Sequence, residues 1–395
     1  MLDTRKQHVF FGYTFSRMYL ETFALERLQS LWEHRVAWNV AESGVEPLRV
    51  EELADTTQAR EALLRQPLAY TQTNGTPELR ALIAALYPGA TATNVQVTNG
   101  GSEANCISLW HLVQAGDEVV MMMPNYMQVA GIARALGARV HGWHLIDGGA
   151  RWRIDPDALD SLVSERTKLI VVCNPNNPTG ACFGTEDLDV ICRHASRAGA
   201  WILSDEIYRG VELRDEETPT MWGRYDRVLV TSGLSKAYGL PGLRIGWIVG
   251  PAATLDHLWA VHDYTTIAPG AMSDCLARVA LAPERRERLL ARARGIVRTN
   301  YPVVKRWIER RTSLLSHAEP HAGAIVFVRY NHPIGSTSLI ERMRDEQSVL
   351  VVPGDHFEMD GYLRIGFGSD PEHLTGALAR IGEVLDGLAA DSGAR

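Results

Sequence analysis

Between residues 46 and 280, the chain alternates short apolar runs with stretches of helical periodicity. The runs 118–123, 169–173 and 228–230 are apolar at nearly every position, and each is followed by turn-forming residues. Continuous apolar runs of this length are typical of strands that are buried on both faces. The alternation with helices therefore predicts an α/β fold, with a mainly parallel sheet covered by helices on both faces.

A different pattern begins at Pro283, where apolar residues recur at the spacing of one helix face. The inward positions of this expected long helix are Leu289, Leu290, Ala293, Ile296, Val297, Val304, Trp307 and Ile308. Strands are expected near 325–328 and 362–367. A final helix would turn Leu374, Leu378, Ile381 and Leu385 inward. We expect a smaller α+β domain in this part of the chain.

The size of the chain fits two domains. Its 395 residues are 46% hydrophobic and 22% charged, which is enough for two sizeable cores. We expect an N-terminal segment (1–45) that packs with the small domain, a large domain (46–280), and a small C-terminal domain (281–395).

Charge and composition exclude several classes of partner. The formal net charge is −7, so no basic surface for nucleic acid is expected. The sequence has no apolar window of the roughly 18 residues that a membrane span needs, and no signal peptide, so we expect a cytoplasmic protein. The five cysteines show no Cys-x-x-Cys spacing and the histidines no His-x-x-x-His pair, so neither a disulfide framework nor a metal site is expected.

The most informative residue is a lysine between two expected strands, 228–230 and 244–249. Lys236 would lie at the C-terminal end of a strand, where open α/β sheets place their chemistry. A lysine in a turn is normally solvated. Here mostly apolar neighbours disfavour the charged form, and such a lysine can form a Schiff base. Ser235 and Arg244 could both reach one phosphate.

This run resembles the lysine motif of the class I/II aminotransferases, enzymes of fold type I that use pyridoxal 5′-phosphate (PLP). The resemblance extends from about residue 41 to residue 367, and it implies a seven-stranded sheet with Lys236 joined to PLP as a Schiff base. One position departs from the pattern. The family often has a hydroxyl residue three positions before the lysine, whereas this chain has Gly233 there and Ser232 before it. Phosphate binding would then use one hydroxyl fewer.

Two further motifs fit the same resemblance. Asp205 ends the apolar run 201–205 and forms an Asp-x-x-Tyr element with Tyr208. In the family this aspartate pairs with the pyridine nitrogen, which makes the ring an electron sink. Asn177 lies in an Asn-Asn-Pro-Thr-Gly run that resembles the family's Asn-Pro-x-Gly signature. The resemblance implies that Asn177 and Tyr208 donate to the 3-oxygen of the ring. Without the resemblance, Asp205 would be interpreted as a helix N-cap, and the Asn-Asn-Pro-Thr-Gly run would be interpreted as a turn.

A glycine turn after the expected strand at residue 95 begins a helix. Exposed backbone N–H groups at a helix N-terminus bind anions. Gly101, Ser102 and Glu103 are therefore the expected phosphate cup, with Arg244 and Ser235 opposite. Glu103 can contribute only its backbone N–H, because its carboxylate would repel the phosphate.

The resemblance also implies roles for two tyrosines and for the substrate site. Tyr126 would lie over the pyridine ring, and Tyr70 would reach the cofactor phosphate of a neighbouring subunit, which implies a homodimer. Arg364 resembles the family's clamp for the substrate α-carboxylate, since its planar fork forms two parallel bonds. Asn177 and Gly44 are expected near the same carboxylate.

The function implied is transamination between an α-amino acid and a 2-oxo acid, with Lys236 as general acid and base. An alternative keeps the cofactor and changes the reaction. The lysine run and 43–45 also resemble capreomycidine synthase-like enzymes, which eliminate a β-hydroxyl from hydroxyarginine and cyclise the product. The side-chain pocket, with Tyr264 and Thr266 as candidates, would discriminate the two.

Two other classes fit less well. A PLP-sensing regulator would carry an N-terminal helix-turn-helix. Only roughly 40 residues precede the large domain (46–280), which is the expected PLP-binding domain, and they leave no room for one. A dinucleotide-binding dehydrogenase would need a Gly-x-Gly-x-x-Gly turn with a later acid, and no such run follows the first expected strand.

Overall fold

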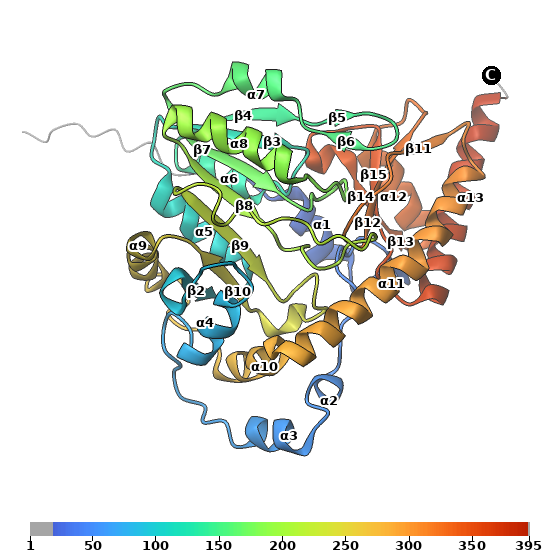
Figure 1. Ribbon diagram of the computed structural model, residues 1–395. Helices are drawn as coiled ribbons and strands as arrows, with labels where there is room; N and C mark the ends of the chain where they lie inside the picture. Colours follow the sequence, from blue (N-terminus) through green and yellow to red (C-terminus); the bar gives the residue numbers. More distant parts are fainter. Residues whose placement is uncertain (1–18, 394–395) are drawn as a thin grey trace, which may run out of the picture.

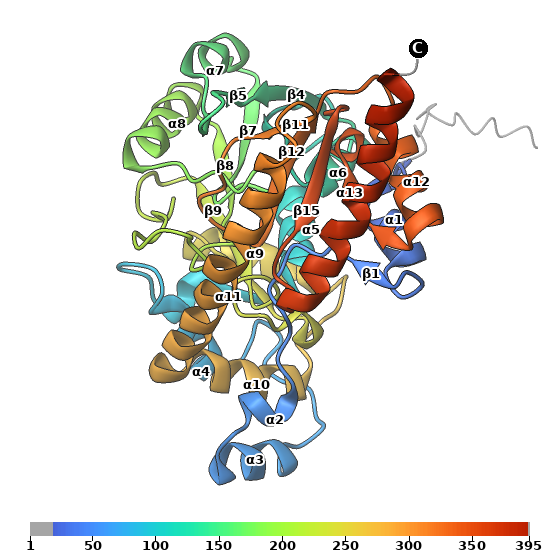
Figure 2. The same ribbon diagram turned by 90° about the vertical axis from the view of Figure 1, so that its right-hand side faces the viewer.

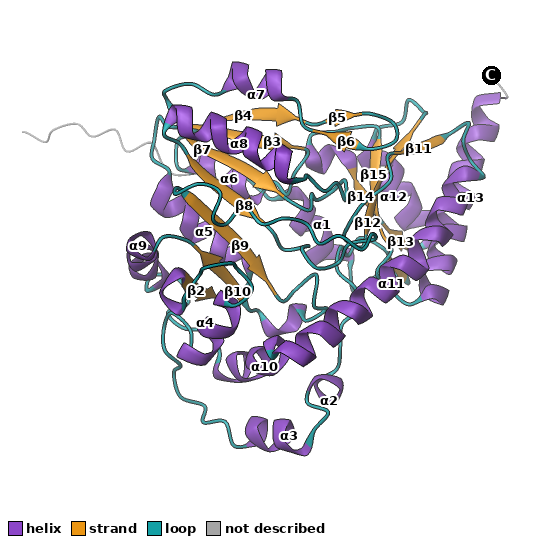
Figure 3. Ribbon diagram, viewed as in Figure 1, coloured by secondary structure: helices purple, strands orange, loops and turns teal. Residues whose placement is uncertain are grey.

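A seven-stranded sheet forms the centre of the larger part of the molecule (Figure 1, Figure 3). The computed structural model describes residues 19–393. Along the sheet the strands are β2 (Val95–Thr98), β10 (Gly246–Val249), β9 (Val228–Gly233), β8 (Trp201–Asp205), β7 (Thr167–Cys173), β3 (Glu118–Met123) and β4 (Arg139–His144). Adjacent strands are parallel except where β10 is involved. The expected α/β class, with a mainly parallel sheet of seven strands, is confirmed.

Strand β10 runs against its neighbours because the chain returns to the sheet through a short loop. Parallel strands need a longer crossover, usually through a helix. Residues 234–245 contain only the 3-10 turn Pro241–Leu243, so β10 starts at the edge where β9 ends. The strand begins at Gly246, later than the expected residue 244, because Arg244 has a φ of 50°. This loop carries Lys236 and stays at the edge of the sheet.

Helices bury both faces of the sheet, as the continuous apolar runs predict. Along β3, Val119 and Met121 belong to one core, whereas Val120 and Met122 belong to the other. One face is covered by α5 (Gly101–Leu112), α6 (Gln128–Ala135) and α9 (Ala252–His262). The opposite core contains residues of α4 (Pro77–Ala84), α7 (Pro156–Leu162), α8 (Thr185–Ala198) and α10 (Ala271–Leu281).

A four-stranded antiparallel sheet forms the second part. Its strands, in order, are β11 (Leu315–His317), β12 (Ile325–Tyr330), β15 (Tyr362–Gly366) and β14 (Val352–Pro353). Helices α12 (Ser336–Gln347) and α13 (Pro371–Gly393) pack together beside it. The long helix α11 (Pro283–Glu309) contacts α10 at one end of its path and β11 and α13 at the other, so it joins the two parts (Figure 2). The helix expected after Pro283 is confirmed.

The N-terminal part of the described chain lies beside this second sheet. Helix α1 (Ala24–Trp32) precedes β1 (Trp38–Asn39), which pairs in parallel with β13 (Val349–Leu350). Residues 1–18 of the expected N-terminal segment lie outside the described residues. The boundaries after residues 45 and 280 stay a prediction.

The remaining elements are short. Helices α2 (Val50–Leu53) and α3 (Thr57–Leu64) extend away from the rest of the molecule, and α3 has no buried residue (Figure 1, Figure 2). Strands β5 (Ile146–Asp147) and β6 (Trp152–Arg153) form a hairpin. Within residues 19–393, no helix is long and apolar enough to cross a membrane. The same described residues contain no cluster of metal-ligating side chains.

Candidate active site

Ten of the fifteen candidate site residues from the sequence line one cleft of about 280 Å³. The cleft lies at the edge of the large sheet where β7, β8 and β9 end. The ten residues are Gly101, Ser102, Tyr126, Asn177, Asp205, Tyr208, Ser235, Lys236, Arg244 and Arg364. Because parallel strands end at a common edge, residues that are distant in the sequence meet there.

Asp205 lies at the end of β8 and is held by two donors. Its Oδ2 accepts a hydrogen bond from Asn105 Nδ2 at 3.2 Å, and its Oδ1 accepts one from the backbone N–H of Ile207 at 3.1 Å. Asn105 is fixed in turn by the hydroxyl of Thr231, which donates to Asn105 Oδ1 at 2.7 Å. Burial raises the pKa of Asp205, and the hydrogen bond from Asn105 opposes this effect. A cationic ring nitrogen beside Asp205 would stabilise its ionised form.

Arg364 is 1% exposed and reaches the cleft from β15. Its Nη1 donates to Asn177 Oδ1 at 2.9 Å and its Nη2 donates to the carbonyl oxygen of Ala41 at 2.6 Å. Its Nε has no hydrogen-bond partner among the described residues. Burial lowers the pKa of Arg364, although a guanidinium remains charged in proteins. A buried guanidinium with an unused donor suits an anionic ligand such as a carboxylate.

The two residues expected at the 3-oxygen of the ring both line the cleft. Asn177 presents its carbonyl oxygen to Arg364, which leaves its amide nitrogen as a donor for another group. Tyr208 donates to Ser43 Oγ at 2.9 Å. Burial raises the pKa of Tyr208, so the phenol keeps its proton and remains a donor. Their roles toward the ring stay predictions.

The expected phosphate cup combines a helix N-terminus with an arginine. Gly100 has a φ of 93°, and a Cβ at this position would lie 2.3 Å from Arg244 Nη2. Arg244 therefore lies directly against the turn that begins α5, and its Nη1 is 3.4 Å from Ser235 Oγ. Gly101 and Ser102, in the first turn of α5, line the same cleft. This arrangement suits a phosphate dianion.

Glu103 does not line the cleft. Its carboxylate accepts hydrogen bonds from the Asn99 backbone N–H at 2.6 Å and from the hydroxyls of Thr265 and Thr266 at 2.5 and 2.7 Å. Burial acts to raise the pKa of Glu103, but these donors and His262 hold it at about 2. The side chain thus faces the 262–266 segment, and the role of the Glu103 backbone N–H toward the phosphate stays a prediction.

The three tyrosines Tyr126, Tyr70 and Tyr264, together with Thr266, differ in their positions. Tyr126 lines the cleft, and its hydroxyl donates to Glu26 Oε1 at 2.7 Å. Tyr70 is 86% exposed, so it does not belong to the site of its own chain. Tyr264 is 93% exposed, and Thr266 donates to Glu103, so the suggested side-chain pocket does not include them within this chain.

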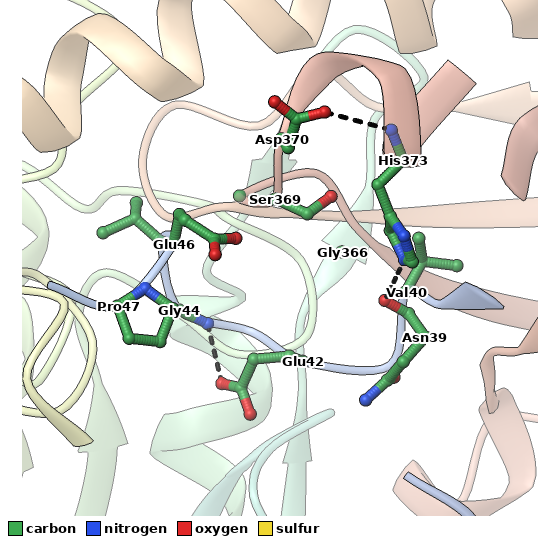
Figure 4. Close-up of a pocket in the computed structure, with 12 residues that line it drawn as sticks. Asn39, Val40, Glu42, Gly44, Glu46, Pro47, Gly366, Ser369, Asp370 and His373 are labelled. Atoms are coloured by element: carbon green, nitrogen blue, oxygen red, sulfur yellow. Dashed lines mark hydrogen bonds between the residues drawn. The ribbon is translucent and has the colours of Figure 1, made fainter. Parts of the chain in front are cut away.

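Gly44 lies beside Lys236 rather than in the cleft wall. A Cβ on Gly44 would lie 3.5 Å from Lys236 Cδ and 3.4 Å from the carbonyl oxygen of Ser235. Gly44 lines a neighbouring pocket of about 340 Å³ together with Glu42, and its backbone N–H donates to Glu42 Oε1 (Figure 4). The structure therefore places Gly44 against the lysine.

Glu42 is the residue that the sequence analysis missed. Lys236 Nζ donates to Glu42 Oε1 at 2.5 Å. The apolar neighbours of Lys236 are buried as expected, Leu234 at 0% exposure among them, but its ammonium has this carboxylate as a partner. No motif marks Glu42. One signal in the sequence could have identified Glu42: it is an acidic residue two positions before Gly44, and Gly44 was already expected near the site.

These groups fit PLP. The cradle at Gly100 suits its phosphate, the partly buried carboxylate of Asp205 suits its ring nitrogen, and Lys236 lines the same cleft. The orphaned Nε of buried Arg364 adds a place for the carboxylate of an amino acid. Fold and cleft together define a PLP-dependent enzyme of fold type I.

Comparison with known proteins gives the family. Residues 45–381 match the model of "Aminotransferase class I and II". The chain belongs to this family, and its cofactor is pyridoxal phosphate.

Two relatives with different activities resemble the chain to a similar degree. It is 34% identical over 315 residues to the capreomycidine synthase of Streptomyces vinaceus, with 79% of each chain covered. It is 30% identical over 336 residues to an aspartate aminotransferase of Streptomyces avermitilis, with 80% of this chain and 81% of the relative covered.

The similar solved structures likewise include both an aminotransferase and a cyclase. A PLP-dependent aminotransferase from Streptococcus suis superposes with a TM-score of 0.88 at 32% identity, covering 93% of this chain and 98% of the other. The PLP-dependent cyclase OrfR superposes with a TM-score of 0.84 at 25% identity, covering 93% and 97%. The family is therefore clear, whereas its members carry out more than one reaction.

Proposed function

We propose that this enzyme transfers the amino group of an α-amino acid to a 2-oxo acid. The observation that carries the proposal is that Lys236 and Arg364 line one cleft, with Asp205 between β7 and β9 at the same sheet edge. An amino acid whose carboxylate is bound by Arg364 would have its amine and α-carbon close to the lysine. The matches to several aminotransferases support this reaction.

Bound PLP supplies an electron sink for the electron pair of the Cα–H bond. The residues of the chain position the reactants and move the proton. Arg364 binds the substrate carboxylate in a planar fork, and Asp205 keeps the ring nitrogen protonated. Lys236 would hold the cofactor covalently, and its Nζ, once freed by the substrate amine, would act as the general base that takes the proton from Cα and as the acid that gives it back. Asn177 would donate to the 3-oxygen, and so would Tyr208 once its O–H turns from Ser43 Oγ to the ring.

The visible absorbance of the cofactor tests this function. Single amino acids are added to the purified holoenzyme without an oxo acid, and then 2-oxoglutarate is added. Transamination converts the cofactor to its pyridoxamine form, and the oxo acid restores the first spectrum. Release of ammonia or of a cyclic product without this conversion would contradict the proposal.

Elimination with cyclisation of a hydroxylated amino acid is the second candidate. The observation that favours it is the match to a capreomycidine synthase and to a PLP-dependent cyclase. The same cleft would serve, because the proton abstracted by Lys236 is common to both reactions. In that case, the absorbance experiment would show product formation with the cofactor unchanged at the end.

A homodimer is part of the proposal. The extension around α2 and α3 leaves Leu64, Leu68 and Tyr70 at least 84% exposed, as expected for a surface that a second copy covers. Tyr70 would then reach the phosphate in the partner's site. Sedimentation of the protein, with Tyr70→Phe assayed for cofactor affinity, tests both points. The cytoplasmic location stays a prediction.

A further inference from the structure

Glu42 is a carboxylate beside the cleft to which the proposed reaction gives no role. Its Oε1 accepts hydrogen bonds from Lys236 Nζ at 2.5 Å and from the backbone N–H groups of Ser43 and Gly44 at 2.9 Å each. The two backbone donors fix this oxygen independently of the lysine. Burial acts to raise the pKa of Glu42, but Lys236, Gly44 and Arg364 hold it at about 2. Glu42 is therefore an anion at neutral pH.

The other charged groups of the site have counterparts on the cofactor or on any α-amino acid. Arg244 faces the phosphate, Asp205 the ring nitrogen and Arg364 the α-carboxylate. Glu42 is instead paired with Lys236 Nζ, the atom that the cofactor engages. A lysine nitrogen bonded to the aldehyde carbon of the cofactor keeps at most one hydrogen, against three in the free ammonium. In the loaded enzyme this nitrogen would therefore offer Glu42 at most one N–H donor.

Glu42 stands where two cavities meet. Ser43 lines the cofactor cleft, whereas Glu42 and Gly44 line the neighbouring pocket of about 340 Å³ (Figure 4). Neighbouring residues of this stretch thus face two different cavities. Gly44 has no side chain, and Lys236 reaches Glu42 past it.

The neighbouring pocket is acidic. Its described lining includes the carboxylates of Glu42, Glu46 and Asp370, and it includes neither lysine nor arginine. The Glu42 side chain is 46% exposed, so its charge is partly screened by water but remains accessible to a ligand. Lys236 lines the cleft and its Nζ contacts Glu42 Oε1, so this carboxylate is within reach of a cationic group on the cleft side.

We propose that Glu42 is a specificity-determining residue that binds the cationic end of the substrate side chain, so that the amino donor is a basic amino acid. This inference rests on the proposed function, because it takes an α-amino acid bound at Arg364 as its starting point. The ammonium of Lys236 marks the position that a substrate ammonium or guanidinium would take at Glu42 Oε1. The same carboxylate repels the side chains of aspartate and glutamate.

Two pairs of probes that differ in charge but hardly in shape test the inference. L-arginine and L-citrulline are compared in the rate of cofactor conversion by the holoenzyme. α-Methylornithine and α-methylnorleucine lack the α-hydrogen, so calorimetry measures their binding without reaction. The variants are Glu42→Gln, which keeps the shape and removes the charge, and Glu46→Gln, which removes a neighbouring charge that does not contact Lys236.

We expect the wild type to prefer the cationic member of a pair by about tenfold, the effect of one charge-assisted hydrogen bond at a partly exposed site. Glu42→Gln should reduce this ratio to about twofold or less, and Glu46→Gln should preserve it. The inference is overturned if the wild type shows no preference for charge, or if Glu42→Gln keeps the preference.

The two proposals fail in different ways. If glutamate or norleucine exchanges its amino group while the cationic probes bind no better, the inference about Glu42 is wrong and the proposed function stands. If the cationic probes are preferred but no amino acid converts the cofactor, the binding role stands and the proposed function is wrong.

Discussion

Arg364 Nη1 donates to Asn177 Oδ1 at 2.9 Å, and this bond links the small sheet to the loop after β7 of the large sheet. Both side chains are buried and line the cleft. The contact orients the guanidinium before any substrate arrives, so less ordering is left to be done on binding. Asn177 thus holds Arg364 in one orientation, which would preorganise it for the carboxylate that we propose it binds.

Arg364→Lys should raise KM for the amino acid by about 10- to 100-fold, because one ammonium replaces a fork that makes two charge-assisted bonds. The affinity for PLP should change little. Steady-state kinetics and a cofactor titration measure the two effects. Arg329→Lys, at an exposed position on the adjacent strand β12, is the matched control. A weaker affinity for PLP with an unchanged KM would argue against the carboxylate role.

Lys236→Ala should abolish the covalent link to PLP and lower the turnover by at least about 10²-fold, since the general acid and base is lost. Borohydride reduction followed by mass spectrometry detects the link. Lys168→Ala removes an exposed lysine and should leave both properties unchanged. A reducible link retained in the Lys236 variant would refute the assignment.

Gly100→Ala should weaken PLP binding, because its Cβ would lie 2.3 Å from Arg244 Nη2 and would displace the guanidinium from the phosphate cup. Gly89→Ala provides the control. Gly89 also has a positive φ, of 74°, but a Cβ there has nothing within 4 Å. Both variants should lose roughly 1–3 kcal/mol of stability through backbone strain. Equal affinities for PLP in the two variants would contradict the role given to Arg244.

We expect the free energy of unfolding to depend on pH through the ionisation of Glu206. Its side chain is buried, and burial raises its pKa to about 7 from an ordinary value of 4.5. The folded state therefore binds this proton more tightly than the unfolded state, so the free energy of unfolding falls as the pH rises from about 4.5 to 7. A shift of this size corresponds to roughly 3 kcal/mol.

Glu206→Gln should remove that part of the slope, because an amide does not ionise. Urea unfolding at pH 5 and pH 8 measures the change, and the variant should gain stability relative to the wild type at the higher pH. The same slope in both proteins would show that Glu206 is not the group responsible.

The parts of the site that the sequence predicts are those built from a strand and the turn that follows it. Asp205, Asn177 and Gly101 each follow an apolar run, and the common edge of a parallel sheet brings such residues together. Arg244 was expected at the start of a strand. Its positive φ places it in the turn instead, since a backbone conformation set by close packing leaves little trace in local hydrophobicity.

Glu42 could not be predicted by the same route. Its partner Lys236 is 194 positions away, and the contact depends on how the N-terminal segment crosses the edge of the large sheet. The segment itself shows no periodicity that would reveal this path. A sequence reveals that two charged residues lie close in space only when both belong to a recognised motif.

The segment after β1 carries three consecutive acceptors for three side chains of the site. The carbonyl oxygen of Ala41 accepts a hydrogen bond from Arg364, the Glu42 carboxylate accepts one from Lys236, and the Ser43 hydroxyl accepts one from Tyr208. Its length is therefore restricted: inserting or deleting one residue between β1 and Gly44 would misalign all three contacts together.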